Sequence, residues 1–118
     1  MTAEKFIGVA IDRGQSLGAD ALSALERTVF LISEVEVYCT KDGIDSFIVR
    51  YDTAGLRQAS EAFAMIGATE VAAALEALAR AGPEFPEPLL ERANNLVVDH
   101  VGWDYDTIHA AVSRQLER

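Results

Sequence analysis

The sequence predicts an all-α protein, folded as one compact bundle of about six helices joined by short loops. Apolar residues recur three or four positions apart along most of the chain, and glycine and proline separate these runs. Half of the 118 residues are hydrophobic and a quarter are charged, which is typical of an ordinary globular protein. The length suits a single domain, so we expect one helical domain over residues 1–118.

The first helix is expected over residues 3–11, where apolar residues fall at helical spacing. Gly14 and Gly18 should end this helix or loosen the segment after it. The second helix is expected to begin after Ser23, because Ser23 and Glu26 have the capping-box pattern. In this pattern each side chain accepts a hydrogen bond from a free backbone N–H at the start of the helix.

The second helix is broadly apolar and is expected near the centre of the core. One stripe carries Leu25, Val29, Ile32 and Glu36. Its β-branched residues make a strand the competing prediction, but the apolar positions do not alternate and the run is longer than a typical strand. Glu36 is a candidate for a partly buried acid that is hydrogen-bonded to a neighbouring helix, and a structural role is favoured for it.

A turn at Asp42-Gly43 separates the second helix from a short amphipathic helix, expected over residues 44–51. Asp52 and Thr53 can cap the next helix along the chain.

Gly67 is expected to close that helix in a left-handed cap, and Thr69 to start another one. The helix after Thr69 is rich in alanine and stops at Gly82-Pro83. Because the link between the two helices is very short, they should pack as an antiparallel hairpin.

Segment 82–88 contains all three prolines and is the one real linker, placed inside the domain. Pro88 suits a first helical residue. Gly102 breaks the pattern, and Asp104 or Asp106 should then cap a last helix that ends near the C-terminus.

Three runs in the middle of the chain come one after another in a distinctive order. They are Ile-Ser-Glu-Val-Glu (32–36), Asp-Gly-Ile-Asp-Ser-Phe (42–47) and Glu-Ala-Phe-Ala-Met-Ile-Gly-Ala (61–68). In this order they resemble a bacterial all-helical domain family of unknown function named after DNA mimic protein 19. That family has a helix ending in Glu-Val-Asn-Asn, then Gly-Gly-Phe and a short aromatic-rich helix, and later an Ile-Gly-Ala turn. The resemblance is strongest over residues 25–78.

The chain departs from the family pattern near the first of these turns. Tyr38, Cys39, Thr40 and Lys41 stand where the family has its Asn pair, and Ile44 replaces the Phe that comes after Gly. Any role of those Asn side chains is therefore not carried over to this chain. The resemblance implies the fold more than the function.

Negative charge is concentrated in the second half of the chain. Of the net charge of −9, residues 58–106 supply −7 from nine acids and two bases, and the remaining residues supply −2 from ten acids and eight bases. A negative field disfavours nucleic acids and anionic membranes and favours a basic protein surface, such as that of a transcription factor, nuclease or toxin. The predicted protein-binding acids are Glu61, Glu70, Glu76, Glu84, Glu87, Glu91, Asp99, Asp104 and Asp106.

Three of these acids have a spacing of special interest. If their segment is helical, Glu84, Glu87 and Glu91 lie along one face about 5–6 Å apart, which is comparable with successive phosphates on one DNA strand. Pro86 and Pro88 interrupt the segment and weaken this match. The alternative is that the carboxylates only solvate exposed helix faces.

Trp103 and Tyr105 lie in the break before the last helix. If they are buried, they complete the core, which is the more frequent case. If they are exposed beside Asp104 and Asp106, they are candidate aromatic anchors for a basic partner.

No catalytic residue, metal site or cofactor is predicted. Metal-ligand types gather at Asp99, His100, Asp104, Asp106 and His109, but the spacing of the two histidines matches no established metal site. One surface histidine, one partly buried histidine and two competing capping acids are expected instead. A single cysteine, with no signal-peptide pattern and no apolar run long enough to cross a bilayer, indicates a cytoplasmic protein.

Three functions are therefore weighed. The leading hypothesis is a non-enzymatic interaction module that occupies a basic surface, as a DNA mimic or as an immunity-type inhibitor. The second is a structural or oligomerising domain, a homodimer for example, whose charge serves only solubility. An enzyme or metal-binding protein centred on His100 and His109 ranks well below both.

Overall fold

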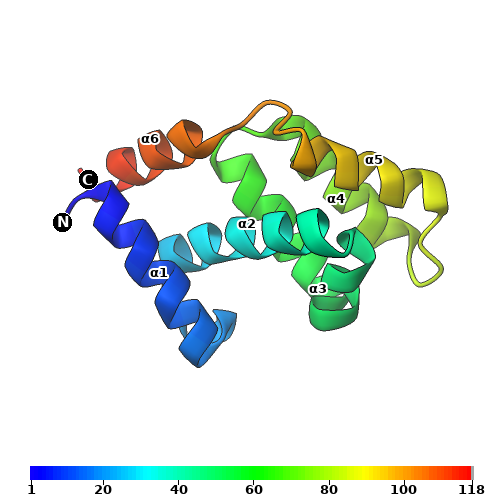
Figure 1. Cartoon of the computed structure of the whole chain (residues 1–118), viewed down its shortest axis with the longest axis horizontal. Helices are drawn as coiled ribbons and strands as arrows, with labels where there is room; N and C mark the ends of the chain where they lie inside the picture. The colour runs from blue at the N-terminus through cyan, green and yellow to red at the C-terminus, as the bar shows by residue number, and fades with distance from the viewer. Residues whose placement is uncertain (118) are drawn as a thin grey trace.

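Six α-helices and one 3-10 turn make up the computed structural model of the chain, which describes residues 1–117 (Figure 1). No strand forms among these residues, so the predicted all-α class is confirmed. The elements are α1 (Ala3–Leu17), η1 (Ala19–Ala21), α2 (Ala24–Lys41), α3 (Ile44–Met65), α4 (Thr69–Ala81), α5 (Glu87–Val98) and α6 (Tyr105–Leu116).

Helix α1 is longer than the sequence pattern predicts. It does not end near residue 11 but continues through Gly14 to Leu17, and Gly18, with φ +86°, terminates it. Gly14 is buried, and a methyl group there would lie 2.2 Å from the ring of Phe30. Close packing of Phe30 on the α1 backbone therefore accounts for a glycine inside this helix, where glycine is ordinarily unfavourable.

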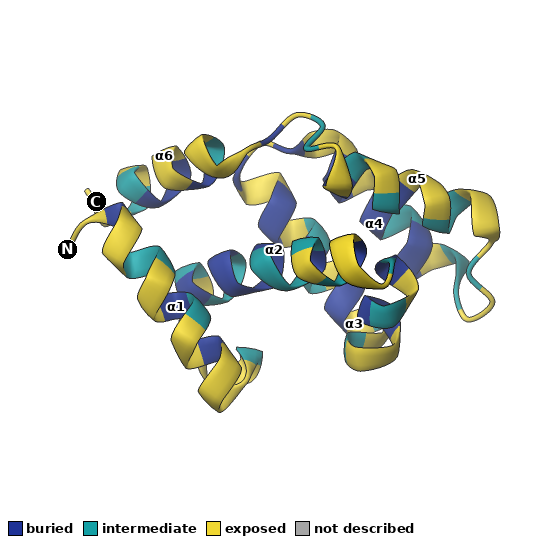
Figure 2. Ribbon diagram, in the orientation of Figure 1, coloured by how far each residue is buried: buried dark blue, intermediate teal, exposed yellow. Residues whose placement is uncertain are grey.

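The capping box at the start of α2 is confirmed. The Glu26 N–H donates to Ser23 Oγ at 3.3 Å, and the Ser23 N–H donates to Glu26 Oε1 at 3.0 Å. Arg13 of α1 lies 3.3 Å from the other oxygen of Glu26, so the cap also ties α1 to α2. From this start α2 crosses the middle of the molecule, where its buried side chains pack against α1 and α3 (Figure 2).

Helix α3 consists of two helical segments that meet where the sequence predicts a boundary. Asp52 has φ 62° and ψ −171°, a non-helical conformation inside the element. Gly67, with φ +86°, lies just beyond its C-terminal end, and the Ala68 N–H donates to the Phe63 carbonyl at 2.9 Å. This is the expected left-handed cap.

Helices α3 and α4 then pack against each other. The hydroxyl of Ser60 donates to the carbonyl of Ala72 at 2.7 Å, across the short link between the two helices. Along the sequence, Ser60 and Ala72 are equally far from Ile66 at the link, as expected for the predicted antiparallel hairpin.

The last two helices begin close to their predicted positions. Pro86 is the N-cap of α5, and Pro88 lies in its first turn. Asp104, rather than Asp106, caps α6: its Oδ1 accepts from the Thr107 N–H at 2.8 Å. Figure 1 shows α6 returning to α1, so that the start of α1 and the end of α6 lie at the same end of the molecule.

Candidate functional site

Helix α5, the connection to α6 and α6 itself come one after another along one long side of the molecule (Figure 1). Five acids lie on α5, on the connection after it and at the start of α6, and we call these five acids the acidic edge. All of them are exposed, and Arg92 is the only Lys or Arg between residues 87 and 106. The members of the acidic edge are Glu87, Glu91, Asp99, Asp104 and Asp106.

The other four predicted acids lie on neighbouring elements. Glu61 is on α3, Glu70 and Glu76 are on α4, and Glu84 is in the loop before α5. Glu76 is half-buried and pairs with Arg80 at 3.1 Å, whereas the other three are exposed.

The condition for a helical row of Glu84, Glu87 and Glu91 is not met at Glu84. Glu84 lies outside α5, because the prolines of the loop keep its backbone out of the helix. Glu87 and Glu91 remain neighbours one turn apart. Glu91 and Asp99 both line a shallow groove of about 390 Å³ along α5, and Arg92 lines it as well.

Among residues 1–117, a base pairs with one of the nine predicted acids, Glu76. Within residues 1–117, the ion pairs are Arg13–Glu26, Arg80–Glu76 and His100–Glu36. Eight of the nine predicted acids therefore have no ion-pair partner in this part of the chain, and the same eight are exposed. Their charges act on the surrounding solvent and on any approaching molecule.

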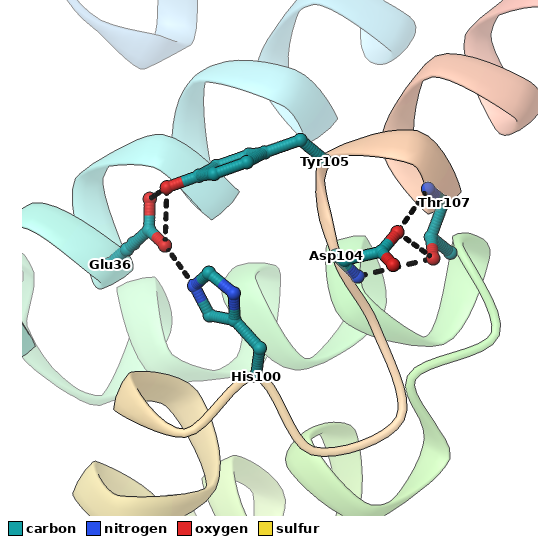
Figure 3. A network of polar contacts seen from close by, with 5 residues as sticks. All are labelled: Glu36, His100, Asp104, Tyr105 and Thr107. Carbon is teal, nitrogen blue, oxygen red and sulfur yellow. Dashed lines mark hydrogen bonds and ion pairs between the residues drawn. The ribbon is translucent and has the colours of Figure 1, made fainter.

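A polar network centred on Glu36 adjoins the acidic edge (Figure 3). His100 Nε2 lies 2.5 Å from Glu36 Oε2. The Tyr105 hydroxyl donates to both Glu36 oxygens, at 2.8 and 2.9 Å. The Glu36 side chain is 18% exposed, so the prediction of a partly buried acid bonded to a neighbouring helix is confirmed. The network joins α2 to the start of α6.

The two candidate aromatic anchors have different environments. Trp103 is only 4% exposed and its ring packs edge-on against Phe63, with 5.3 Å between centroids, so it is a core residue and not a surface anchor. Burial was the alternative that the sequence left open. Tyr105 is 59% exposed and lies 5.4 Å from the His100 ring. Its ring is therefore accessible although its hydroxyl is bound to Glu36.

Local hydrogen bonds control the ionisation of two groups in this region. Hydrogen bonds from the backbone and side chain of Thr107, with a smaller contribution from the charge of His100, hold the pKa of Asp104 below its usual value. The hydrogen bond to Glu36 raises the pKa of Tyr105. Asp104 is thus held as a carboxylate by its role as a helix cap.

The cluster of metal-ligand types in the sequence is not assembled by the fold. His100 contacts Glu36, whereas His109 is exposed on α6. Over the described part of the chain, no three His, Cys, Asp or Glu side chains are placed to hold a metal ion. Cys39 is buried, and desolvation raises the pKa of its thiol to about 12. None of the helices described has the length and apolarity needed to cross a membrane.

The sequence identified Glu36 as unusual but did not connect it with His100 and Tyr105. These residues are 64 and 69 positions away in the chain. The available signal was an acid on an apolar stripe, which must find hydrogen-bond donors when it is buried. That signal requires a donor without saying which residue supplies it.

A protein-family model described as DMP19-like protein matches residues 20–115, which is most of the chain. DMP19 stands for DNA mimic protein 19. The comparison with curated proteins finds no match, and neither does the comparison with solved structures.

Proposed function

Because the chain belongs to the DMP19-like family, we propose that it binds a DNA-binding protein and presents its carboxylates in place of DNA phosphates. The observation that carries this proposal is the set of eight exposed acids without an ion-pair partner within residues 1–117. Five of these acids form the acidic edge, where Arg92 is the only Lys or Arg.

The physical basis is competition for the same basic side chains. DNA attracts proteins through a dense line of phosphate charges, and Lys and Arg on the protein provide most of the sequence-independent affinity. Glu87 and Glu91 are four residues apart on α5 and thus separated by about 6 Å along the helix axis. A basic surface shaped for phosphates meets carboxylates at comparable intervals here.

Tyr105 adds an aromatic contact to this surface. Its ring is exposed beside Asp104 and Asp106, and Glu36 holds its hydroxyl in place. An aromatic ring favours a guanidinium or ammonium group on its face, so Tyr105 and its acidic neighbours suit a basic partner. The proposed role requires no catalytic residue. A transcription factor as partner would make the protein a regulator, and a nuclease or toxin would make it an immunity-type inhibitor.

The test begins with capture of partners from a cell lysate on the immobilised chain and then purification of the captured protein. We expect the chain to displace double-stranded DNA from that protein in a gel-shift assay, with an affinity that falls steeply as salt increases. The charge-reversal variant Glu91→Lys/Asp99→Lys should bind the partner at least about tenfold more weakly.

A matched control separates the acidic edge from net charge. The control variant Asp12→Lys/Asp42→Lys changes the net charge by the same amount. Asp12 is an exposed acid inside α1 and Asp42 is the exposed C-cap of α2, which matches the positions of Glu91 and Asp99 in α5. This control should retain most of the affinity. Equal losses in both variants, or partners that keep their DNA in the presence of the chain, would contradict the proposal.

A further inference from the structure

A second concave site lies apart from the acidic edge. A cavity of about 770 Å³ opens between the C-terminal half of α1, η1, α2 and α3, and no residue of α4, α5 or α6 lines it. This volume is within the range of pockets that bind small molecules. The proposed role of the acidic edge makes no use of it.

Three aromatic residues contribute to its wall. Phe30 and Tyr38 lie two turns apart on one face of α2, and Tyr51 faces them from α3. The rings of Tyr38 and Tyr51 are 6.4 Å apart and nearly perpendicular. Gly14 and Gly55 also line the cavity, and a Cβ at either would lie within 2.3 Å of Phe30 or Tyr51, respectively. Because Gly14 and Gly55 have no side chain, Phe30 and Tyr51 can pack closely against the helix backbones.

A carboxylate lies between the rings. Glu34 is one turn from both Phe30 and Tyr38, and its Oε2 accepts a hydrogen bond from the Tyr51 hydroxyl at 2.7 Å. Burial, and to a lesser extent this hydrogen bond, raises the pKa of Tyr51, so the phenol stays a donor. The second oxygen, Oε1, has no hydrogen-bond or ion-pair partner among the described residues. Glu34 is partly exposed, so this oxygen is accessible from the cavity and can accept a hydrogen bond from a bound group.

Other features of the lining also favour positive charge. Asp20 contributes a second carboxylate. The last turn of α1 lines the cavity and contains no basic side chain, so the negative end of this helix dipole faces the cavity, although Arg27 donates to the Ala19 carbonyl just beyond it. Arg50 is the single Lys or Arg of the lining, and its Cζ lies 5.2 Å from the centroid of the Tyr51 ring. This contact places the chain's own guanidinium against the Tyr51 ring, and the two carboxylates of the lining outnumber this one positive charge.

We propose that this cavity binds an organic cation, a guanidinium or ammonium group carried on a small apolar body. The cation donates to Glu34 Oε1, and the partly exposed ring of Tyr38 contacts the apolar body and the face of the charged group. The inference is independent of the acidic edge, so either proposal can fail without the other.

The test titrates n-butylguanidinium into the full chain and monitors backbone amides by two-dimensional NMR. We expect concentration-dependent shifts at Gly14, Gly18 and Gly55, with at least about tenfold weaker binding of the neutral analogue n-butylurea. Glu34→Gln keeps an acceptor for Tyr51 but removes the charge, and should weaken n-butylguanidinium at least about tenfold. Glu61→Gln removes an exposed acid of α3 outside the cavity and should leave binding unchanged.

A second arm distinguishes the source of the cation. A short peptide with one arginine between glycines is compared with n-butylguanidinium, and both are compared with the same peptide carrying citrulline. Binding of the free cation supports a small-molecule ligand, whereas binding of the arginine peptide alone supports a side chain of a partner protein. The proposal is overturned if the neutral probes bind as well as the charged ones, or if no probe shifts the amides around the cavity.

Discussion

Individual polar side chains determine how the helices of this protein are joined. Glu36 connects α2 to α6 by accepting from His100 and Tyr105, and Glu34 connects α2 to α3 by accepting from Tyr51. Each acid is partly buried, where an unsatisfied carboxylate would be costly. These hydrogen bonds therefore bear on both stability and ionisation.

The Tyr51–Glu34 bond should make stability depend on alkaline pH. The pKa of Tyr51 is raised in the folded state. The contribution of its hydrogen bond to the free energy of unfolding is therefore complete below the unfolded-state pKa of about 10, and it is lost as the pH rises towards the folded-state pKa. We expect Tyr51→Phe to lower the free energy of unfolding by about 1 kcal/mol at neutral pH.

The difference between wild type and Tyr51→Phe should then shrink above about pH 10, as measured by urea unfolding over a pH series. Tyr38→Phe is the control at neutral pH, because the Tyr38 hydroxyl has no hydrogen-bond partner among the described residues. A Tyr51→Phe protein as stable as wild type at neutral pH would show that the bond to Glu34 adds nothing.

Within a helix, the same residue type has opposite consequences at different positions. Helix α1 contains two glycines in its interior. Gly8 is exposed and has open space where a side chain would stand, whereas Gly14 is buried against Phe30. Only the contact with α2 distinguishes them.

This pair of glycines provides a matched test of packing in α1. Gly8→Ala should raise the free energy of unfolding by roughly 0.5–1 kcal/mol, because alanine loses less backbone entropy in a helix. Gly14→Ala should lower it by roughly 1–3 kcal/mol, because the new methyl group forces the ring of Phe30 to move. Chemical denaturation of both variants measures the two changes, and stabilisation by both would refute the close packing of Phe30 on α1.

The molecule as a whole carries far more negative than positive charge. Its 19 acids face 10 Lys and Arg, and three ion pairs form within residues 1–117. Uncompensated like charges repel one another and oppose the compact state. The concentration of acids in residues 58–106 makes this repulsion strongest around α4 to α6.

Salt should therefore stabilise the fold. Raising sodium chloride from about 10 mM to about 150 mM shortens the Debye length from about 30 Å to about 8 Å and screens the repulsion between acids. We expect the thermal midpoint of unfolding to rise over this range, and to rise less for Glu91→Lys/Asp99→Lys. A midpoint that falls with salt would mean that attractive pairs outweigh the repulsion.

Much of the secondary structure could be predicted because the signals are local. The capping box of Ser23 and Glu26, the left-handed cap at Gly67 and the cap of α6 all depend on residues within about one helical turn of each other. The negative charge of the second half is likewise a property of composition. These features predicted the helical class, most helix starts and the negative charge of the second half.

Contacts between distant segments supplied the rest. Packing against Phe30 carries α1 through Gly14, contact with Phe63 buries Trp103, and residues more than 60 positions away satisfy Glu36. The first turn of α3 obeys the same principle, since its Ile44 N–H donates to the side chain of Asn94 on α5 at 3.0 Å. A local pattern specifies that a group needs a partner or a space, but the chain supplies many equivalent candidates, and the packing of the helices selects one of them.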